Sequence, residues 1–318
     1  MPSIIQFIHP GGEHGYDVIE RNKYKKNWHI LLSKNGKKLD HQRKFMVNEG
    51  SYIENDILQK GKLLFWGEWE PTSLVETLNQ PQIYIKKIDR YPEYLHFPYL
   101  PPKETIKQYQ DENRRNISTY QNTDPFIFGN NFRYAICHQK HYTRLKNLEI
   151  GSLILFGSSI DSRFVIDTVF VVGDKKTYNT SNIENIGCDD TFYPEIVLKM
   201  TCKNDKSDGE QYTLYYGATY KDRAKFNGMF SFVPAKKYSG EKQGFPRFYF
   251  SDDFYNSENN KLNKYISKGL TQGIKSNSEY KISINEVKVF WEYIKNEVSK
   301  NYILGINFEM PNETILKI

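Results

Sequence analysis

Two tryptophans alternate with two carboxylates where an apolar run ends, and this combination could bind a planar ligand. The segment at 65–71 reads FWGEWEP. Alternate side chains of a strand point to opposite faces, so Trp66, Glu68 and Glu70 would share one face. An indole ring supplies a stacking surface, and carboxylates accept hydrogen bonds from exocyclic amines. The segment therefore predicts a nucleobase pocket. The alternative is a strand end with a core tryptophan and solvated acids.

A glycine-rich loop after the first apolar run forms a second polar cluster. Its members are His9, Gly11, Gly12, Glu13 and His14. The Pro-Gly-Gly sequence inside it excludes the helix that aligns metal ligands at i and i+4, so no metal site is predicted. The glycines let the backbone approach a ligand closely, while Glu13 and His14 could contact it. A structural turn whose polar side chains face water is the alternative.

A third cluster mixes an acid, an imidazole and two cations shortly after an Asn-Gly turn. It consists of Asp40, His41, Arg43 and Lys44. Arg43 and Lys44 could hold a phosphate, and His41 or Asp40 could transfer a proton. A solvated charged surface is the alternative. Each of the three clusters adjoins an apolar, strand-like run, which would allow them to meet at one end of a sheet.

Strands and turns must position these clusters. Apolar runs bounded by turn residues predict strands at 4–8, 28–33, 63–69 and 83–88. Residues 1–102 are therefore predicted to form a β-rich domain. The highly polar stretch 103–123 is predicted to be a solvated helix or a linker.

The remaining residues, 124–318, are predicted to form a second β-rich domain that ends in a helix. Strand-like runs lie at 132–137, 151–157, 163–173, 195–202, 212–216, 229–233 and 246–250. The runs at 151–157 and 163–173 flank a polar turn and predict an antiparallel hairpin. Ser283 and Glu286 have capping-box spacing before apolar residues at helical intervals, which predicts an amphipathic C-terminal helix.

The predicted hairpin resembles a known family. Its two runs read GSLILFG at 151–157 and FVIDTVFVV at 164–172. Within 128–173 this pair resembles the strand pair of the PUA-like superfamily, which includes the ASCH, EVE and YTH domains. The resemblance implies a small antiparallel β-barrel that reads RNA or a modified, flipped-out base. The segment 61–66 has a similar pattern of glycine followed by apolar residues, which would imply a second such module. No catalytic residue is carried over from the family.

A further stretch interleaves aromatic residues with glycine. It runs from Tyr215 to Tyr220 and from Gly228 to Pro234, with Lys221, Arg223, Lys225, Lys236 and Lys237 nearby. Aromatic faces beside cations suit nucleic acid. A barrel core with a charged rim is the alternative.

Composition limits the classes of function. With 318 residues the chain can hold two domains, and a formal charge of +6 would assist approach to a polyanion. Cys137, Cys188 and Cys202 lack CxxC spacing and are expected to be reduced thiols. The sequence has no P-loop, dinucleotide fingerprint or nucleophile elbow, so ATP-driven, dehydrogenase and α/β-hydrolase functions lose their usual support. No apolar run reaches the roughly 18–20 residues of a membrane span, and no secretory signal is evident, so a cytoplasmic protein is expected.

The sequence thus predicts a two-domain, β-rich α+β protein that binds DNA or RNA and recognises a modified or flipped-out base. If it is a base-excising hydrolase, Glu13 or Glu70 would activate water or stabilise positive charge at the sugar, and His41 or His9 would assist the leaving base. The other pocket residues are expected to be Gly11, Gly12, His14, Asp40, Arg43, Lys44, Trp66 and Glu68. No cofactor is expected, and defence against modified phage DNA is consistent with this function. A non-catalytic reader and a free-nucleotide enzyme or sensor stay open as alternatives.

Overall fold

The structure of the protein is a computed structural model, and its description covers most of the chain. The described residues are 1–9, 11–13, 43–69, 73–79, 86–100, 123–135, 137, 139, 142–179, 181–183, 186–188, 192–198, 211–240, 243–257, 262–268, 273–276 and 282–312. Within these residues the chain is rich in strands and has few helices, which confirms the predicted β-rich α+β class at this level.

The first sheet is mixed and contains the predicted hairpin. Its strands are β1 (Ile4–His9), β6 (Arg133–Tyr134), β7 (Leu153–Ile160), β8 (Arg163–Tyr178), β9 (Tyr212–Gly217), β11 (Phe248–Tyr249) and β12 (Gly273–Ser276). The order is β12-β1-β7-β8-β9-β6, and β11 also pairs with β8. β7 and β8 pair antiparallel across a turn at Asp161 and Ser162, whose φ angles of 48° and 58° fit a tight hairpin turn. β1 runs parallel to β7.

The second sheet contains a ring of paired strands. Its members are β2 (Lys44–Glu54), β3 (Ile57–Gly67), β4 (Ser73–Thr77), β5 (Tyr94–Pro98), β10 (Val233–Lys237) and β13 (Ile303–Phe308). β2 pairs with β3, β3 with β10, β10 with β13, and β13 again with β2, which closes the ring. β5 pairs with β2 on one side and with β4 on the other.

Both sheets combine strands from the two halves of the chain. β1 pairs with β7 and β12, while β2 and β3 pair with β13 and β10. The predicted division into 1–102 and 124–318 therefore does not separate the sheets. A local pattern of apolar residues specifies a strand but not its partner, which explains the difference. The predicted linker lies outside the described residues, except for Thr123.

Among the described residues the helices are short except for α6 (Ile284–Ser299), which begins with the predicted capping box. Ser283 accepts from the backbone N–H of Glu286, and the Glu286 carboxylate accepts from the N–H of Ser283. The other α-helices among the described residues are α3 (Thr143–Lys146) and α5 (Asp252–Asn256). The strand predicted at 195–202 is wrong in its described part, because Tyr193–Leu198 forms a π-helical turn. The predicted strand at 28–33 lies outside the described residues, as does 83–85 of the strand predicted at 83–88. The described end of the latter is not a strand, because Lys87–Asp89 forms a 3-10 turn.

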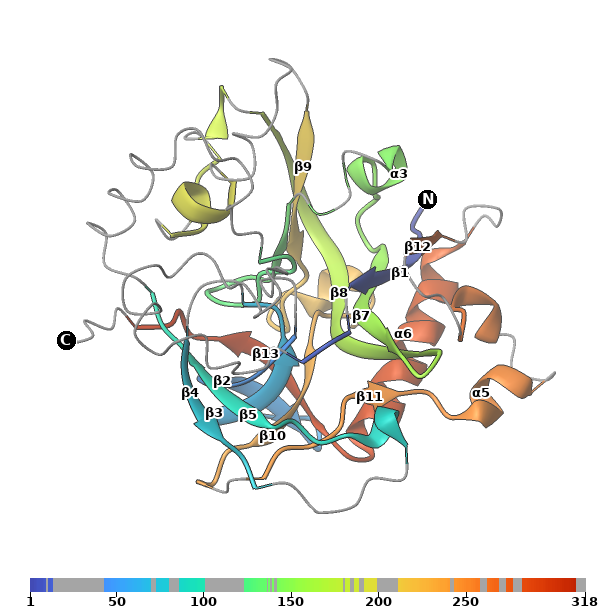
Figure 1. Ribbon diagram of the computed structural model, residues 1–318. Coiled ribbons are helices and arrows are strands. Elements are labelled where there is room, and N and C mark those ends of the chain that lie inside the picture. Colours follow the sequence, from blue (N-terminus) through green and yellow to red (C-terminus); the bar gives the residue numbers. More distant parts are fainter. Residues whose placement is uncertain are drawn as a thin grey trace.

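Two apolar cores lie on opposite faces of the first sheet. Ile5 and Phe7 of β1 join residues of the second sheet in one core, whereas Ile4 and Ile8 point to the other core, which α6 covers. Figure 1 shows α6 beside β7 and β8. His9 alternates along β1 with Ile5 and Phe7 and so faces the same side of the strand. Its ring therefore points toward the space between the sheets.

Candidate functional site

The register of the β2–β3 hairpin brings Arg43 and Glu68 together. Lys44 pairs with Gly67 in the last rung, so the next residues, Arg43 and Glu68, face each other. The Arg43 Nη1 donates to the Glu68 Oε2 at 2.5 Å, and both side chains are buried. This contact joins two of the three predicted polar clusters.

His9 brings the remaining cluster to the same point. Its Nδ1 lies 3.1 Å from the Glu68 Oε2, and its Nε2 lies 3.3 Å from the Cys137 Sγ. The ring is held edge-on to Phe7 at a centroid distance of 4.6 Å. The predicted clusters around residues 9, 43 and 68 therefore meet between the two sheets.

A second ion pair extends this buried cluster. The Arg247 Nε donates to the Asp167 Oδ1 at 2.6 Å, and its Nη2 contacts both the other oxygen of Asp167 and the Ser158 Oγ. The Arg43 Nε lies 3.7 Å from the same Asp167 carboxylate. We call the five side chains His9, Glu68, Arg43, Asp167 and Arg247 the buried charge cluster. Buried charges are costly unless they are paired, which accounts for this continuous chain of contacts.

Mutual attraction holds Glu68 and Arg43 in their charged forms. Burial raises the pKa of Glu68, but the charges of Arg43 and His9 outweigh burial and lower the pKa overall. Burial lowers the pKa of Arg43, but Glu68, Asp167 and Cys137 outweigh it and raise the pKa overall. For Arg247, burial prevails over the attraction of Asp167, so its pKa is lowered.

A small pocket adjoins the buried charge cluster and shares Arg247 with it. The pocket has a volume of about 190 Å³. It is lined by Gly11, Gly12, Glu13, Trp66, Ile88, Arg90, Tyr91, Ser159, Ile160, Asp161 and Arg247. We call it the Glu13 pocket. The backbone oxygen of Gly11 accepts from Arg247 at 3.3 Å, and that of Gly12 accepts from the Arg43 N–H at 2.9 Å.

Gly11 fits closely against the end of β7. A Cβ atom at this position would lie 2.8 Å from the backbone oxygen of Ser159 and 3.2 Å from the Ser158 Cβ. The sequence therefore needs glycine here for close approach to the protein's own backbone, and the approach of the loop to a ligand stays a prediction.

Glu13 is the titratable group most suited to proton transfer in this pocket. Its Oε1 accepts from the backbone N–H groups of Glu93 and Tyr94 at 2.7 and 3.1 Å. Burial raises the pKa of Glu13 to about 7, although the N–H of Tyr94 and the charge of Arg90 act in the opposite direction. A carboxyl group with such a pKa is present in both protonation states at neutral pH.

Trp66 lines the Glu13 pocket but is mostly held by the protein. Its side chain is 6% exposed, and its Nε1 donates to the backbone oxygen of Phe245 at 2.9 Å. The ring packs against Phe45, and the Arg247 guanidinium carbon lies 5.6 Å from its centroid. Phe65 and Trp69 lie in the other core, as the strand alternation predicted. Trp66 therefore lines a pocket and also packs in a core, and its stacking on a base stays a prediction.

The predicted site residues divide into three groups. Gly11, Gly12, Glu13 and Trp66 line the Glu13 pocket, while His9, Arg43 and Glu68 lie in the buried charge cluster. His14, Asp40, His41 and Glu70 lie outside the described residues. Lys44 is 1% exposed and Arg43 is 2% exposed, so neither presents an accessible cation for a phosphate.

Sequence reasoning missed three residues of this region. Asp167 interrupts the apolar run at 164–172, and a lone acid in a buried strand requires a partner, which was the available signal. Arg247 similarly stands between aromatic residues. Cys137 carried no local signal, because its partner His9 is 128 residues away.

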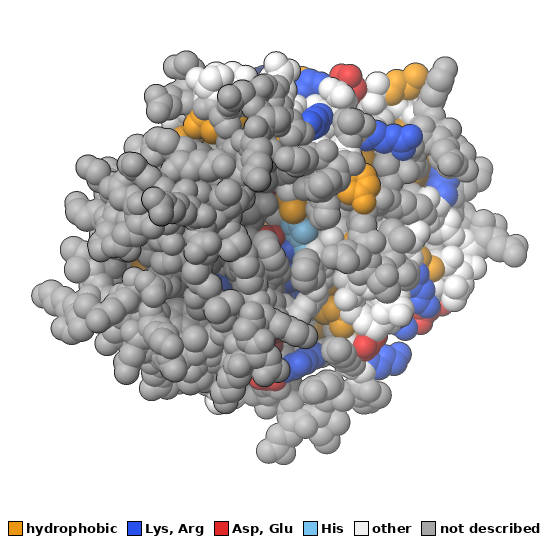
Figure 2. Space-filling view, turned by 45° about the horizontal axis from the view of Figure 1, so that its top comes forward, with side chains coloured by type: hydrophobic (Ala, Val, Ile, Leu, Met, Phe, Trp, Pro, Cys, Tyr) orange, Lys and Arg blue, Asp and Glu red, His pale blue; other side chains and the backbone are white. Residues whose placement is uncertain are grey.

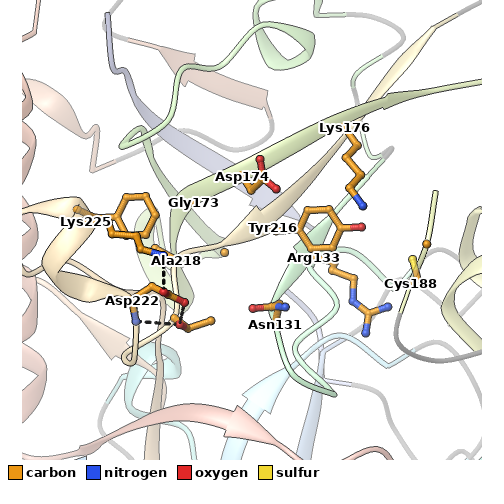
Figure 3. A pocket seen from close by; sticks show the side chains of 14 residues that line it. Asn131, Arg133, Gly173, Asp174, Lys176, Cys188, Tyr216, Ala218, Asp222 and Lys225 are labelled. Carbon is orange, nitrogen blue, oxygen red and sulfur yellow. Dashed lines mark hydrogen bonds and ion pairs between the residues drawn. The ribbon is translucent and has the colours of Figure 1, made fainter.

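A larger cavity of about 440 Å³ lies at the other end of β8. Figure 3 shows Tyr216, Lys176, Arg133 and Cys188 gathered on one side of it and Asp222 with Lys225 on the other. The Arg133 guanidinium lies over the rings of Phe126 and Tyr193, with its carbon 5.1 and 4.5 Å from their centroids.

The aromatic residues and cations predicted to suit nucleic acid therefore lie partly at this cavity and partly in the core. Tyr216 lines this cavity, but Tyr215 is buried and stacks on Tyr134 at a centroid distance of 5.8 Å. The Lys225 cation is paired with Asp222 at 2.9 Å, which offsets its charge.

No family model, curated protein or solved structure matches this chain. The described helices include none that is long and apolar enough to cross a membrane. Among the described residues, no three His, Cys, Asp or Glu side chains are arranged to hold a metal ion.

Proposed function

We propose that the protein binds nucleic acid and holds one modified or flipped-out base in the Glu13 pocket. The observation that carries this proposal is the Glu13 carboxyl, whose pKa is raised to about 7 in a pocket that Trp66 and glycine backbone also line. A titratable group with a perturbed pKa in a concave, partly aromatic pocket is a typical feature of functional sites.

The size and polarity of the pocket favour a single heterocycle. Its volume of about 190 Å³ compares with roughly 30 Å³ for each liquid water molecule, so a small ring fits better than a whole nucleotide. Glu13 can accept a hydrogen bond as a carboxylate and donate one as an acid, which suits the mixed edge of a base. The modest positive charge of the chain supports attraction to a polyanion.

The resemblance to the PUA-like superfamily supports the same function. Its barrels read RNA or flipped-out bases, and the resembling segment forms β7 and β8, whose connecting turn borders the Glu13 pocket through Asp161. Base flipping brings one nucleotide out of the stack and into such a pocket.

Hydrolysis of the N-glycosidic bond is the reaction we propose for this pocket. Glu13 as a carboxylate would take a proton from the attacking water, and as an acid it would give a proton to the leaving base. His9 is less suited to assist here than predicted, because its two nitrogens already contact Glu68 and Cys137. A non-catalytic reader would use the same contacts without turnover.

Mass analysis of bases released from plain and naturally modified DNA tests the proposal. Glu13→Gln keeps an acceptor oxygen for the two backbone N–H groups, so the pocket should stay folded. We expect the wild-type protein to release a base and Glu13→Gln to bind the same DNA with turnover lowered at least 100-fold. Glu49→Gln, an exposed acid on β2, is the matched control and should retain turnover.

The other outcomes discriminate between the classes of function. Base-dependent binding without release, weakened by Glu13→Gln, would indicate a reader. Equal turnover in Glu13→Gln and wild type would contradict a catalytic role for Glu13. Saturable binding of free nucleotides with no affinity for polymers would contradict the nucleic-acid proposal.

A further inference from the structure

Cys137, His9 and Glu68 form a line of three side chains from distant parts of the chain. The Cys137 Sγ lies 3.3 Å from the His9 Nε2, and the His9 Nδ1 lies 3.1 Å from the Glu68 Oε2. A nucleophile in contact with a base, which a third group orients, is the arrangement that activates a thiol or hydroxyl for covalent catalysis. We call these side chains the thiol triad.

Each member of the thiol triad is fixed by further contacts. The Asp124 carboxylate accepts from the backbone N–H groups of Ala135 and Cys137 at 3.0 and 2.8 Å, which holds the turn that carries the sulfur. The Tyr134 hydroxyl donates to the Cys137 backbone oxygen at 2.7 Å. Arg43 donates to the same Glu68 Oε2 that His9 contacts.

A cation of the buried charge cluster interacts with Cys137. Among the described residues, His9 contacts the Cys137 sulfur, and Arg43 and Tyr134 interact with Cys137 electrostatically. Asp124 accepts from the Cys137 backbone N–H, and Glu68 contacts His9. Burial lowers the pKa of Arg43, yet Glu68, Asp167 and Cys137 raise it overall, so Arg43 and Cys137 interact favourably. A thiolate is the reactive form of cysteine.

The thiol triad reaches the molecular surface through Cys137. Cys137 is partly exposed, and His9 is 6% exposed whereas His96 is fully buried. Figure 2 shows a histidine side chain beside acidic and basic side chains in a hollow on one face of the molecule. A small electrophile can therefore approach this region.

We propose that Cys137 is the nucleophile of a second active site, which transfers acyl groups from carboxylic esters. His9 takes the proton from the Cys137 sulfur through its Nε2, and the thiolate attacks the carbonyl carbon. The carbon–oxygen bond to the leaving alcohol breaks, a thioester forms, and His9 gives the proton to the alcohol. Water then attacks the thioester, which releases the carboxylic acid and restores the thiol.

Glu68 positions His9 in this reaction rather than contacting the substrate. Its carboxylate fixes the tautomer with the proton on Nδ1 and stabilises the imidazolium that forms. The reaction does not require the Glu13 pocket to bind a base. Failure of one proposal therefore leaves the other unaffected.

Reaction of the full-length protein with 4-nitrophenyl acetate tests this proposal. We expect a burst of one equivalent of 4-nitrophenolate per chain, and peptide mass mapping should place the acetyl group on Cys137. Cys137→Ser should lose the burst and Cys188→Ser should retain it, since Cys188 is the other described, partly exposed cysteine. His9→Gln should slow acetylation by about 100-fold or more.

Alkylation by iodoacetamide provides a measurement that does not depend on turnover. Cys137 should react faster than Cys188 at neutral pH, because His9 lies in position to accept its proton. In His9→Gln this advantage should disappear while circular dichroism shows a folded protein. If His9→Gln does not fold, the comparison of Cys137 with Cys188 in the wild-type protein still tests the proposal. Acetylation at Cys188 instead, or a Cys137 that reacts no faster than Cys188, would overturn the proposal.

Discussion

Glu13 has a carboxyl group in surroundings that favour its neutral form. Burial raises its pKa from 4.5 to about 7, against the opposing effects of the Tyr94 N–H and Arg90. Because this pKa is higher in the folded than in the unfolded chain, protonation of Glu13 favours folding. That contribution is fully present below about pH 4 and is lost as the pH rises through 7.

The first prediction concerns the stability of Glu13→Gln as a function of pH. Glutamine keeps the acceptor oxygen but carries no charge, so the variant avoids the cost of a buried carboxylate. We expect its stability relative to wild type to increase between pH 5 and pH 8, by up to about 3 kcal/mol from a shift of this size. Urea unfolding at several pH values measures this difference. A difference that stays constant with pH would contradict the raised pKa.

Trp66 provides the second prediction at the residue scale. Its ring is 6% exposed and its Nε1 is bonded to Phe245, so Trp66→Ala leaves a cavity and an unpaired carbonyl. We expect a loss of about 3–5 kcal/mol in the free energy of unfolding. Trp66→Phe keeps part of the packing and should lose less. A loss below about 1 kcal/mol for Trp66→Ala would show that the ring is not packed as described.

At the scale of elements, strand geometry assembles the site. The hairpin register sets Arg43 opposite Glu68, and alternation along β1 points His9 into the same space. The hairpin turns at Asn55 and Asp56, whose φ angles are 51° and 61°. Residues with positive φ at both central positions give the turn type that matches the twist of paired strands.

The third prediction tests this turn. Asparagine tolerates the left-handed conformation better than alanine because its short polar side chain can hydrogen-bond locally. Asn55→Ala should therefore destabilise the protein by about 1 kcal/mol, whereas Asn55→Gly should be neutral. Thermal unfolding of the two variants gives the comparison. Equal melting temperatures for the two would contradict the assigned backbone conformation.

Local elements with a strong pattern were predictable from the sequence. The hairpin of β7 and β8 follows from its two apolar runs, and α6 follows from its capping box. The loop glycines, Glu13 and Trp66 were recognisable as unusual combinations beside strands. Strand partners were not predictable, because β1 pairs with β12 across most of the chain. The thiol triad escaped prediction for the same reason, since its members are close only after folding.

At the scale of the whole molecule, Asp167 joins segments that are far apart in sequence. It lies in β8 and binds Arg247, which precedes β11, and it lies near Arg43 before β2. The site and the assembly of the two sheets therefore depend on the same buried charges.

The fourth prediction compares two aspartates that pair with arginines. Asp167→Asn leaves two buried guanidinium groups without their shared anion and should cost about 3–5 kcal/mol of stability. Asp252→Asn removes the exposed partner of Arg163 and is the matched control, with little change expected. Urea unfolding measures both. Equal losses would contradict a buried charge cluster.

The most direct test of the account is to fill the Glu13 pocket. Ile160→Trp places a large ring in the pocket, and Ile57→Trp places the same ring on an exposed site of β3 as control. Fluorescence anisotropy would give the affinity of each folded variant for a single-stranded oligonucleotide that carries the base bound by wild type. A stacked base contributes about 1–3 kcal/mol. Ile160→Trp should therefore bind roughly 10-fold more weakly, or worse, while Ile57→Trp binds as wild type. Unchanged affinity in a folded Ile160→Trp protein would contradict the account.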